Sequence, residues 1–360
     1  MLRRRDDPVV SDSILVVGGA GYIGSHMCHA LLDAGYTVTV LDNLSRGHRD
    51  AVDGADLIVG DIRSGADLQA CFKRRSYDLV MHFAALAYVG ESVSDPSAYY
   101  DNNVRGSLHL LDAMRNAGVH RLVFSSTCAT YGDPMERPIT ERHAQNPVNP
   151  YGRTKLVVEQ ALADFARAYG CQSISLRYFN AAGCDPAGRV GERHDPETHL
   201  IPLVLEQALR VQNGADPEAT DLMVLGSDFP TDDGTCVRDY IHVTDLCRAH
   251  LLAAERLLSG GVVGAEAYNL GNGRGYSVLE IIRAARRVTG MDIRYRIAER
   301  RPGDPAWLVG CAGKAGAVLG WTPLIEDIDE IVATAWRWMS RRECPAASSA
   351  HALEGEPDTL

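Results

Sequence analysis

Three glycines at three-residue intervals join a β-branched run to a helical pattern near the start of the chain. The stretch ILVVGGAGYIGSHMCHALLDAG places Gly18, Gly21 and Gly24 at this junction. Glycine allows the tight turn between strand and helix, and it lets backbone N–H groups approach a pyrophosphate at the positive end of the helix. The spacing G-x-x-G-x-x-G differs from the commoner G-x-G-x-x-G, but in this context it predicts a dinucleotide-binding loop.

Short β-branched runs alternate with longer helical patterns from residue 13 to about residue 180. The runs are ILVVG, TVTVLD, DLIVG, DLVMHFA, RLVFSS and SISLRYFN. This alternation is typical of a parallel sheet with crossover helices. The predicted fold class is therefore α/β, with a doubly wound, Rossmann-type parallel sheet forming an NAD-binding domain at 13–180.

The residue pattern of the sequence changes after residue 180, where Gly, Pro, Asp and Thr separate shorter predicted elements. We expect a smaller, mixed α/β substrate domain at 181–342. The apolar run at 267–271 favours a strand that returns to the first sheet, so part of this region, about 235–275, is expected to belong with the first domain. Residues 343–360 lack periodicity and are expected to form a disordered tail.

The residue at the end of the second predicted strand indicates which dinucleotide is bound. The Asp42 carboxylate can accept hydrogen bonds from a ribose diol and would repel a 2′-phosphate, so NAD is favoured over NADP. Arg46 nearby weakens this preference a little. After the third strand, Asp61 is a candidate contact for adenine, although a helix N-cap explains this carboxylate equally well.

A tyrosine and a lysine four residues apart begin another predicted helix, in NPYGRTK. Tyr151 and Lys155 therefore share one helix face. Tyrosine has a reference pKa of about 10 and acts as a base at neutral pH only where positive charge stabilises the phenolate. Lys155 and an oxidised nicotinamide would supply that charge. Thr127, at the end of the strand in RLVFSSTCATYG, is expected to project toward the same crevice.

The bulk properties exclude several classes of function. The net charge of -11 argues against a polyanion-binding surface, so nucleic acid is not an expected partner. The nine cysteines form no C-x-x-C pair, and no H-E-x-x-H or comparable spacing occurs, so no metal is expected. Neither a signal peptide nor an apolar run of transmembrane length is evident, which favours the cytoplasm and no membrane partner.

Five motifs together resemble the UDP-glucose (UDP-galactose) 4-epimerases of the extended short-chain dehydrogenase/reductase family. They are GGAGYIGSH, SSTCATYG, NPYGRTK, RYFNAAG and DGTCVRDYIHVTDL, and the resemblance extends from residue 13 to about residue 342. It implies a tightly bound NAD that is recycled in each turnover and C4 epimerisation of the sugar through a 4-keto intermediate. It also implies that Tyr151 is the acid/base, that Thr127 bonds the same sugar oxygen, and that Lys155 lowers the pKa of the tyrosine and holds the nicotinamide ribose.

The resemblance also assigns binding positions, residue by residue. The implied cofactor-binding residues are Gly18, Gly21, Tyr22, Ile23, Gly24, Asp42, Asn43, Asp61, Ile62, Phe83, Ala84, Asn102, Tyr151, Lys155 and Phe179. The implied substrate-binding residues are Thr127, Asn180, His199, Leu200, Arg238, Tyr240, Arg301, Asp304 and Leu308. A homodimer is further implied, through helices near 97–117 and 150–169.

The sequence departs from the family pattern at positions that bear on the sugar. Ala87 stands where many UDP-glucose epimerases have a lysine, and the Ala-Tyr version also resembles UDP-pentose 4-epimerases. Leu308 stands where the family has a bulky tyrosine or a small residue, which raises the hypothesis of partial tolerance of UDP-GlcNAc. Thr127 replaces a more frequent serine, and His199 an asparagine.

Two other interpretations are considered. Nucleotide-sugar 4,6-dehydratases share the fold but usually have Asp-Glu after the threonine, where this chain has Cys128 and Ala129, so dehydration is disfavoured. A non-enzymatic NAD-binding module could lose Tyr151 or Lys155 without penalty, whereas both are intact.

Overall fold

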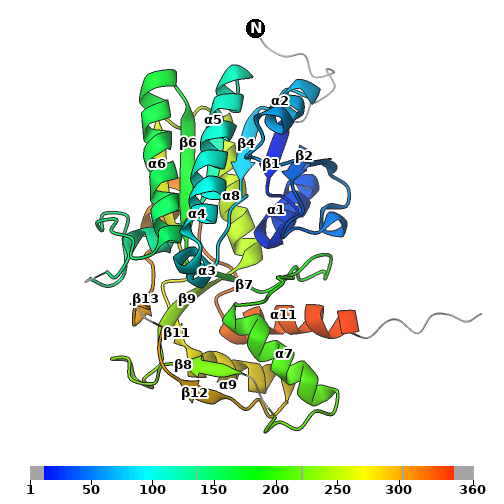
Figure 1. Ribbon diagram of the computed structural model, residues 1–360, viewed down its shortest axis with the longest axis vertical. Coiled ribbons are helices and arrows are strands. Elements are labelled where there is room, and N and C mark those ends of the chain that lie inside the picture. Colours follow the sequence, from blue (N-terminus) through cyan, green and yellow to red (C-terminus); the bar gives the residue numbers. More distant parts are fainter. Residues whose placement is uncertain (1–11, 135, 220–221, 302–303, 344–360) are drawn as a thin grey trace, which may run out of the picture.

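A seven-stranded, all-parallel sheet dominates the larger part of the molecule (Figure 1). The computed structural model describes residues 12–134, 136–219, 222–301 and 304–343. The strand order is β10-β6-β5-β4-β1-β2-β3. The strands are β1 (Ser13–Val17), β2 (Thr37–Asp42), β3 (Asp56–Val59), β4 (Leu79–His82), β5 (Arg121–Thr127), β6 (Gln172–Tyr178) and β10 (Ala265–Leu270). The predicted doubly wound parallel sheet is confirmed.

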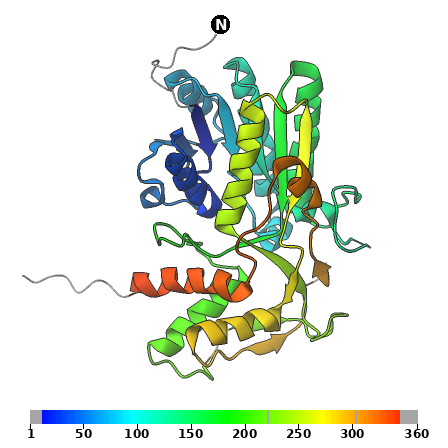
Figure 2. The ribbon, with the colours of Figure 1, turned by 180° about the vertical axis from the view of Figure 1, so that it is seen from behind.

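Both faces of this sheet are covered by helices, which explains why its strands read as continuous apolar runs. Ile14 and Val16 of β1 pack on one face, and Leu15 and Val17 pack on the other, because successive side chains of a strand point to opposite sides. Figures 1 and 2 show the two layers from opposite directions. One layer holds α1 (Tyr22–Asp33), α8 (Val243–Leu258) and α10 (Gly313–Leu319), and the other holds α2 (Gly65–Arg74), α5 (Gly106–Asn116) and α6 (Pro150–Tyr169).

The strand order reverses between β1 and β4, which are neighbours in the sheet. In open parallel sheets, ligands bind beyond the carboxyl ends of the strands at such a switch point. The glycine loop follows β1, and the segment with Phe83 and Ala84 follows β4. Between β4 and β5 lie α3 (Val89–Ser94), α4 (Pro96–Tyr99) and the π-helical turn η2 (Tyr100–Arg105).

A second unit lies beyond the carboxyl ends of the strands, in the lower part of Figure 1. Its mixed sheet has the order β11-β9-β13 with β7 paired to β9, and a two-stranded sheet joins β12 to β8. Three helices pack around a separate apolar core. These elements are β7 (Asn180–Ala182), α7 (Leu200–Gln212), β8 (Met223–Leu225), β9 (Val237–His242), β11 (Gly275–Ser277), α9 (Val278–Thr289), β12 (Arg296–Ala298), β13 (Trp307–Leu308) and α11 (Ile328–Glu343).

The chain passes between the two units more than once. Within 235–275, β9 belongs to the second sheet, whereas α8 packs against the first sheet and β10 pairs with β6. The domain limits at 180 and 342 therefore remain proposals about how to divide interleaved segments. Of the expected tail, residues 344–360 lie outside the described residues. Among the described helices, none is both long enough and apolar enough to cross a membrane.

Candidate active site

In the glycine loop, close packing leaves no room for a side chain at two of the glycines, whereas the third has room for a methyl group. Gly18 has φ +78°, and a Cβ there would lie 2.3 Å from the Ala84 nitrogen. A Cβ on Gly24 would lie 2.2 Å from the Gly18 oxygen. On Gly21, by contrast, the nearest atom would be 3.6 Å away. Gly21 is also the N-cap of α1 and provides no side-chain cap, so the first N–H groups of α1 fit an anion such as a pyrophosphate.

Asp42 lies at the end of β2 and is held in place by the backbone. Its two oxygens accept from the Ala20 N–H at 2.9 Å and from the Leu44 N–H at 2.8 Å. Burial raises the pKa of Asp42, and these two hydrogen bonds oppose the rise. A carboxylate has about four acceptor positions, so two remain for a ribose diol.

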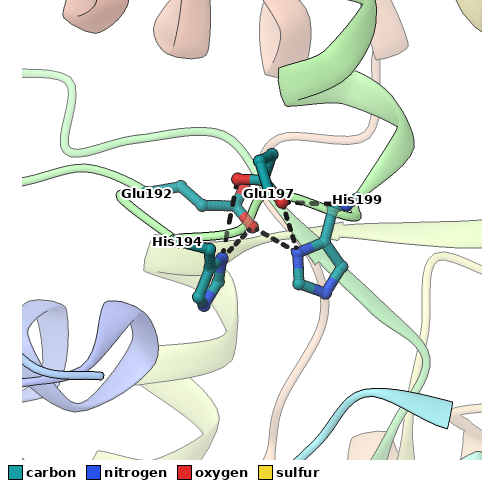
Figure 3. Close-up of side chains that lie close together, drawn as sticks. All are labelled: Glu192, His194, Glu197 and His199. Carbon is teal, nitrogen blue, oxygen red and sulfur yellow. Dashed lines mark hydrogen bonds and ion pairs between the residues drawn. The ribbon is translucent and has the colours of Figure 1, made fainter. Parts of the chain in front are cut away.

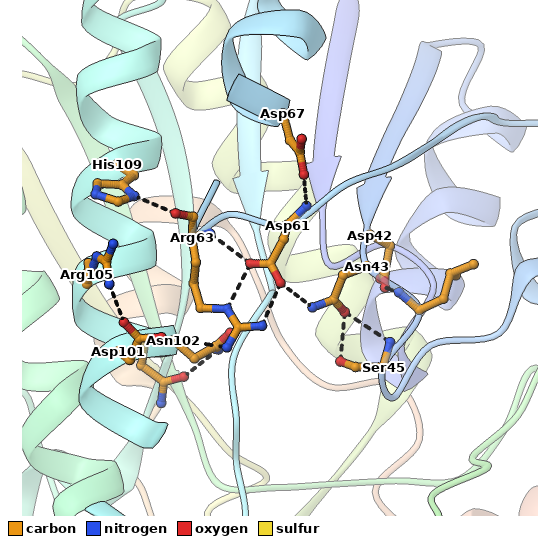
Figure 4. Close-up of polar contacts among 12 residues, drawn as sticks. Asp42, Asn43, Ser45, Asp61, Arg63, Asp67, Asp101, Asn102, Arg105 and His109 are labelled. Atoms are coloured by element: carbon orange, nitrogen blue, oxygen red, sulfur yellow. Dashed lines mark hydrogen bonds and ion pairs between the residues drawn. The ribbon is translucent and has the colours of Figure 1, made fainter. Parts of the chain in front are cut away.

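Asp61 has no such spare capacity (Figure 4). One of its oxygens accepts from the Arg63 N–H and Nε, and the other accepts from Arg63 Nη2 and from Asn43 Nδ2, at 2.7–3.0 Å. The Arg63 hydrogen bond and charge hold the pKa of Asp61 well below its usual range. A direct contact between this carboxylate and adenine would therefore replace one of these bonds. Asn102 lies beside the pair, on the π-helical turn next to Asp101, which Arg63 also contacts at 3.6 Å.

The remaining predicted cofactor positions lie around the switch point. The N–H groups of Phe83 and Ala84 both donate to the Val17 carbonyl, which holds the end of β4 against β1. The Tyr22 hydroxyl donates to the Gly183 carbonyl at 2.6 Å and so ties α1 to the loop after β7. Ile23 is half-buried on α1, Ile62 is buried, and Phe179 is buried between β6 and β7.

The predicted catalytic residues meet at the end of β5. Asn149 caps α6 by accepting from the Gly152 N–H at 2.8 Å, so Tyr151 lies in the first turn and Lys155 one turn later. Both side chains are buried. Thr127 caps the short 3₁₀ helix η3 (Cys128–Tyr131), and its hydroxyl also contacts the phenol of Tyr151.

The hydrogen bond of Lys155 differs from the expectation that this lysine acts directly on Tyr151. Burial raises the pKa of Tyr151, and the hydrogen bond from Thr127 opposes the rise. The Lys155 ammonium donates to the Ser125 carbonyl at 2.8 Å and lies 4.8 Å from the centre of the Phe124 ring. Burial lowers the pKa of Lys155 to about 7, against the opposing charge of Glu159. The hydrogen bond that Lys155 donates thus directs its ammonium to the β5 backbone rather than to the Tyr151 phenol.

A polar network behind this cluster was not evident from the sequence. Arg177 on β6 and Glu159 on α6 form an ion pair in which each side chain is 8% exposed. Arg177 also donates to the Tyr131 hydroxyl at 2.9 Å, and Ser126 donates to Glu159. Buried pairs with this many hydrogen bonds fix geometry. The network therefore fixes α6, and with it the Tyr151–Lys155 face, against β5 and β6.

Four of the predicted substrate residues are paired in the second sheet. Pairing of β7 with β9 sets Asn180 opposite Tyr240, and pairing of β13 with β9 sets Leu308 opposite Arg238. Arg238 forms an ion pair with Asp304. Arg301 is exposed, Leu200 is the first residue of α7, and Tyr240 is buried.

Asp239, which is not among the predicted site residues, fixes the backbone around these residues. Its buried carboxylate accepts from the N–H groups of Asn272, Gly273 and Gly310 at 2.8–3.2 Å. Burial raises its pKa to about 6, against these three hydrogen bonds. Asp239 thereby joins β9 to two loops beside Arg238 and Tyr240.

His199 is held in a cluster with Glu192, His194 and Glu197 (Figure 3). Its Nδ1 lies 2.9 Å from Glu192 and 3.1 Å from Glu197. Burial lowers the pKa of His199, but the hydrogen bonds that its imidazole donates to the two carboxylates outweigh burial and hold the pKa at about 10. The substrate-binding role of His199 stays a prediction, and the contacts of its Nδ1 are with these glutamates.

Residues 14–271 match the model of the NAD dependent epimerase/dehydratase family. The chain belongs to this family. The UDP-glucose 4-epimerase of Halalkalibacterium halodurans is 49% identical over 326 residues, which make up 91% of this chain and 95% of that protein. The predicted resemblance is confirmed.

Solved structures agree with this family membership. The UDP-glucose 4-epimerase from Brucella ovis, in complex with NAD, has a TM-score of 0.85 and 49% identity, covering 91% of this chain and 98% of that one. The enzyme from Bifidobacterium longum, in complex with NAD⁺ and UDP, has a TM-score of 0.85 and 38% identity, covering 92% and 99%. The chain is therefore an NAD-dependent enzyme of this family, which confirms the predicted cofactor and removes the non-enzymatic module from consideration.

Proposed function

We propose that the enzyme interconverts UDP-glucose and UDP-galactose by inverting C4 of the sugar. The observation that carries this proposal is that Tyr151 and Lys155, one turn apart on α6, are both buried, as is Thr127 at the end of β5. The relatives named UDP-glucose 4-epimerases, which match more than nine-tenths of the chain, support this choice of substrate.

The described residues fit NAD at the switch point. The uncapped start of α1 suits the pyrophosphate, and Asp42 has free acceptor positions for a ribose diol. When bound, NAD supplies a hydride acceptor in its oxidised form and a hydride donor in its reduced form. The protein must then orient the sugar, exclude water and move one proton.

Tyr151 is the group we assign to that proton. It takes the proton of the sugar 4-hydroxyl as the 4-keto sugar forms, and returns it when the hydroxyl is restored on the other face. Burial opposes ionisation of the phenol, so nearby positive charge is required. We assign that charge to Lys155, one helical turn away, whose ammonium donates to the Ser125 carbonyl. We assign to the Thr127 hydroxyl a hydrogen bond with the same sugar oxygen.

Inversion at C4 requires the sugar to present both faces while the nucleotide stays fixed. Binding energy should therefore be concentrated on UDP, through residues of the second sheet and its loops. Arg238 and Arg301 suit the diphosphate, because guanidinium groups form charge-assisted, forked hydrogen bonds with phosphate oxygens. Asn180, Leu200, Tyr240 and Asp304 complete the proposed nucleotide site.

The experiment that tests this function is an NMR assay of the purified enzyme without added NAD. UDP-galactose and UDP-arabinose are supplied separately, with Tyr151→Phe as the inactive control. Conversion of UDP-galactose to UDP-glucose that is lost in the variant supports the proposal. Conversion of the pentose alone would instead support a UDP-pentose 4-epimerase, for which Ala87, an exposed residue next to Tyr88, is the motivating feature.

Partial tolerance of UDP-GlcNAc is a second, narrower proposal, and it rests on Leu308. This side chain packs against the cluster of Cys128, Tyr131, Ile139 and Phe179. Leucine is smaller than the tyrosine of some relatives, so it leaves more room for an N-acetyl group. Turnover of UDP-galactose with no detectable turnover of saturating UDP-GlcNAc would contradict this proposal.

We also propose a homodimer through residues 97–117, which run from α4 through η2 and α5, and residues 150–169 of α6. Exposed apolar side chains occur on or beside these elements, with Val93 on α3 at 64% and Tyr100 on η2 at 41% exposure. Light scattering coupled to gel filtration should give twice the chain mass of 39.1 kDa. A monomeric mass at micromolar concentration would contradict the proposal.

A further inference from the structure

Four potential metal ligands converge in the loop between β7 and α7, outside the proposed catalytic group. The spacing is Glu-x-His-x-x-Glu-x-His, from Glu192 to His199. One ligand atom from each residue lies within 4.8 Å of the other three. Figure 3 shows the two imidazoles on either side of the two carboxylates, with both Nδ1 atoms directed inward.

The distances fit a small coordination sphere. His194 Nδ1 lies 3.0 Å from Glu192 Oε1 and 3.7 Å from Glu197 Oε2, and His199 Nδ1 lies 2.9 Å and 3.1 Å from the same two residues. Ligand atoms placed tetrahedrally at ~2.0–2.1 Å from a zinc ion are about 3.3 Å apart. The four separations lie on either side of that value, but His194 and His199 approach different oxygens of Glu197, and the four ligand atoms lie within 4.8 Å of one another. The side chains must therefore move closer together to surround one ion.

Burial and charge favour a divalent cation at this point. The Glu192 and Glu197 side chains are each 8% exposed, and buried carboxylates need a compensating charge. Two nearby arginines are engaged elsewhere, Arg193 with Asp50 and Arg46 with Glu91. The two imidazoles supply this charge when they are protonated, and a divalent ion supplies it in their place when it displaces their Nδ1 protons.

The surroundings of the cluster restrain the imidazole rings. Tyr88 meets His194 and His199 edge-on, with ring centroids 5.9 Å and 6.1 Å apart, and Tyr22 meets His194 at 6.1 Å. The Tyr88 hydroxyl donates to the Pro196 carbonyl at 3.1 Å. Loop residues 192–199 therefore already contact both the start of α1 and the segment after β4.

We propose that Glu192, His194, Glu197 and His199 bind one divalent transition-metal ion, for which zinc fits best. Imidazole nitrogens with carboxylate oxygens suit zinc, whereas magnesium and calcium prefer oxygen ligands alone. Four protein ligands close the coordination sphere, as in structural zinc sites. The ion fixes loop residues 192–199 between Tyr22 and Leu200, and so positions the start of α7 relative to the glycine loop.

The test uses the full chain, purified without a histidine tag, treated with EDTA and desalted. Titration calorimetry with ZnCl₂ should show one ion bound per chain, and MgCl₂ and CaCl₂ should give no such binding. Zinc should also raise the Tm and slow hydrogen exchange at residues 192–199. These readouts do not depend on the sugar that the enzyme uses, so they stand apart from the proposed function.

Two nearly isosteric variants, Glu192→Gln and His194→Gln, should weaken zinc binding by more than the ~10–100-fold that is typical of changes outside the ligand set. His29→Gln, on α1 outside the cluster, is the matched histidine control and should bind zinc as the wild type does. Cys311→Ser combined with Cys344→Ser should also retain binding, which excludes capture by these thiols.

Either of two results would overturn the proposal. One is that the wild-type chain binds no stoichiometric zinc, so that the histidines share only protons with the glutamates. The other is that Glu192→Gln and His194→Gln bind zinc as tightly as the wild type. If these variants fail to fold, the double cysteine variant decides the outcome. It should bind one zinc ion per chain, and zinc should slow hydrogen exchange at its residues 192–199.

Discussion

The cofactor side and the substrate side of the site are assembled in different ways. On the cofactor side, the key residues follow the ends of β1, β2, β3 and β4, so each lies within a few residues of a strand end in the same sheet. On the substrate side, Asn180, Arg238, Asp304 and Leu308 come from separate segments that meet through the pairing of β7 and β13 with β9. A local sequence pattern can therefore reveal the first side, whereas the second depends on tertiary structure.

The two sides also differ in how their charged groups are held. Asp42 is fixed by two backbone N–H groups and keeps free acceptor positions. Arg238 is fixed by a carboxylate, Asp304, which a diphosphate would compete with or join. Changes on the cofactor side should thus act on NAD retention, and changes on the substrate side on KM for the UDP-sugar.

The largest effect is expected where the two sides meet. Tyr151→Phe removes the proton-transfer group, so kcat should fall by roughly 10²–10⁴-fold while NAD stays bound. Coupled assays of kcat and absorbance of the bound nucleotide measure both quantities. Tyr169→Phe, at the exposed end of the same helix, is the control and should leave kcat unchanged. A fall of less than tenfold in Tyr151→Phe would remove this residue from the proposed role.

The next effect isolates the substrate side. Arg301→Ala deletes an exposed guanidinium, so KM for UDP-galactose should rise roughly 10–100-fold, since a hydrogen bond to a charged group contributes about 1.5–3 kcal/mol. NAD content and Tm should stay as in the wild type. Arg300→Ala is the adjacent control, because that side chain lies over Phe229 and near Asp228. Equal KM changes in the two variants would argue against a specific diphosphate contact of Arg301.

A smaller effect isolates the cofactor side. Gly21→Ala adds a Cβ that the protein itself can accommodate at 3.6 Å, so the stability without nucleotide should stay within about 0.5 kcal/mol of the wild type. NAD affinity should nevertheless fall about tenfold, or ~1.4 kcal/mol, because the methyl group stands at the start of α1 where the pyrophosphate binds. Calorimetric titration with NAD measures this, and Gly65→Ala, which has open space, is the control. Unchanged affinity in Gly21→Ala would place the pyrophosphate elsewhere.

The last effect, which concerns stability rather than ligand binding or turnover, is a pH dependence due to Lys155. Burial lowers its pKa in the folded chain to about 7, against ~10.4 in the unfolded chain. The unfolded chain then binds more protons between these values, so Lys155 makes stability rise with pH in that window, by at most ~1.4 kcal/mol per pH unit.

Lys155→Met should lack this rise in stability. The unfolding free energies of variant and wild type, both without bound nucleotide, should therefore differ by an amount that changes between pH 7 and 9. Subtracting the two curves cancels the contributions of cysteines and tyrosines. A pH-independent difference would show that Lys155 keeps its ordinary pKa in the folded chain.

The sequence predicted those parts of the molecule that depend on neighbours along the chain. The six alternating runs correspond to β1–β6, and NPYGRTK begins α6 with Asn149 as its cap. The Arg177–Glu159 pair is not predictable from the sequence, because its members lie on different elements and resemble ordinary surface charges. Asp239 was missed for the same reason, since only folding brings three N–H groups to it.

Two predicted site residues form hydrogen bonds and ion pairs within the protein that a sequence pattern does not predict. All acceptor positions of Asp61 are filled by Arg63 and Asn43. His199 lies among Glu192, His194 and Glu197, in a spacing that matches none of the metal motifs considered in the sequence. Both outcomes depend on loop conformation, which periodicity and propensity do not determine.

The central claim is that C4 is inverted by removal and return of the same hydrogen within one active site. The most direct measurement follows UDP-galactose labelled with deuterium at C4, incubated in ordinary water with the purified enzyme and no added NAD. The UDP-glucose formed should retain deuterium at C4. Replacement of the label by solvent hydrogen during inversion would contradict it.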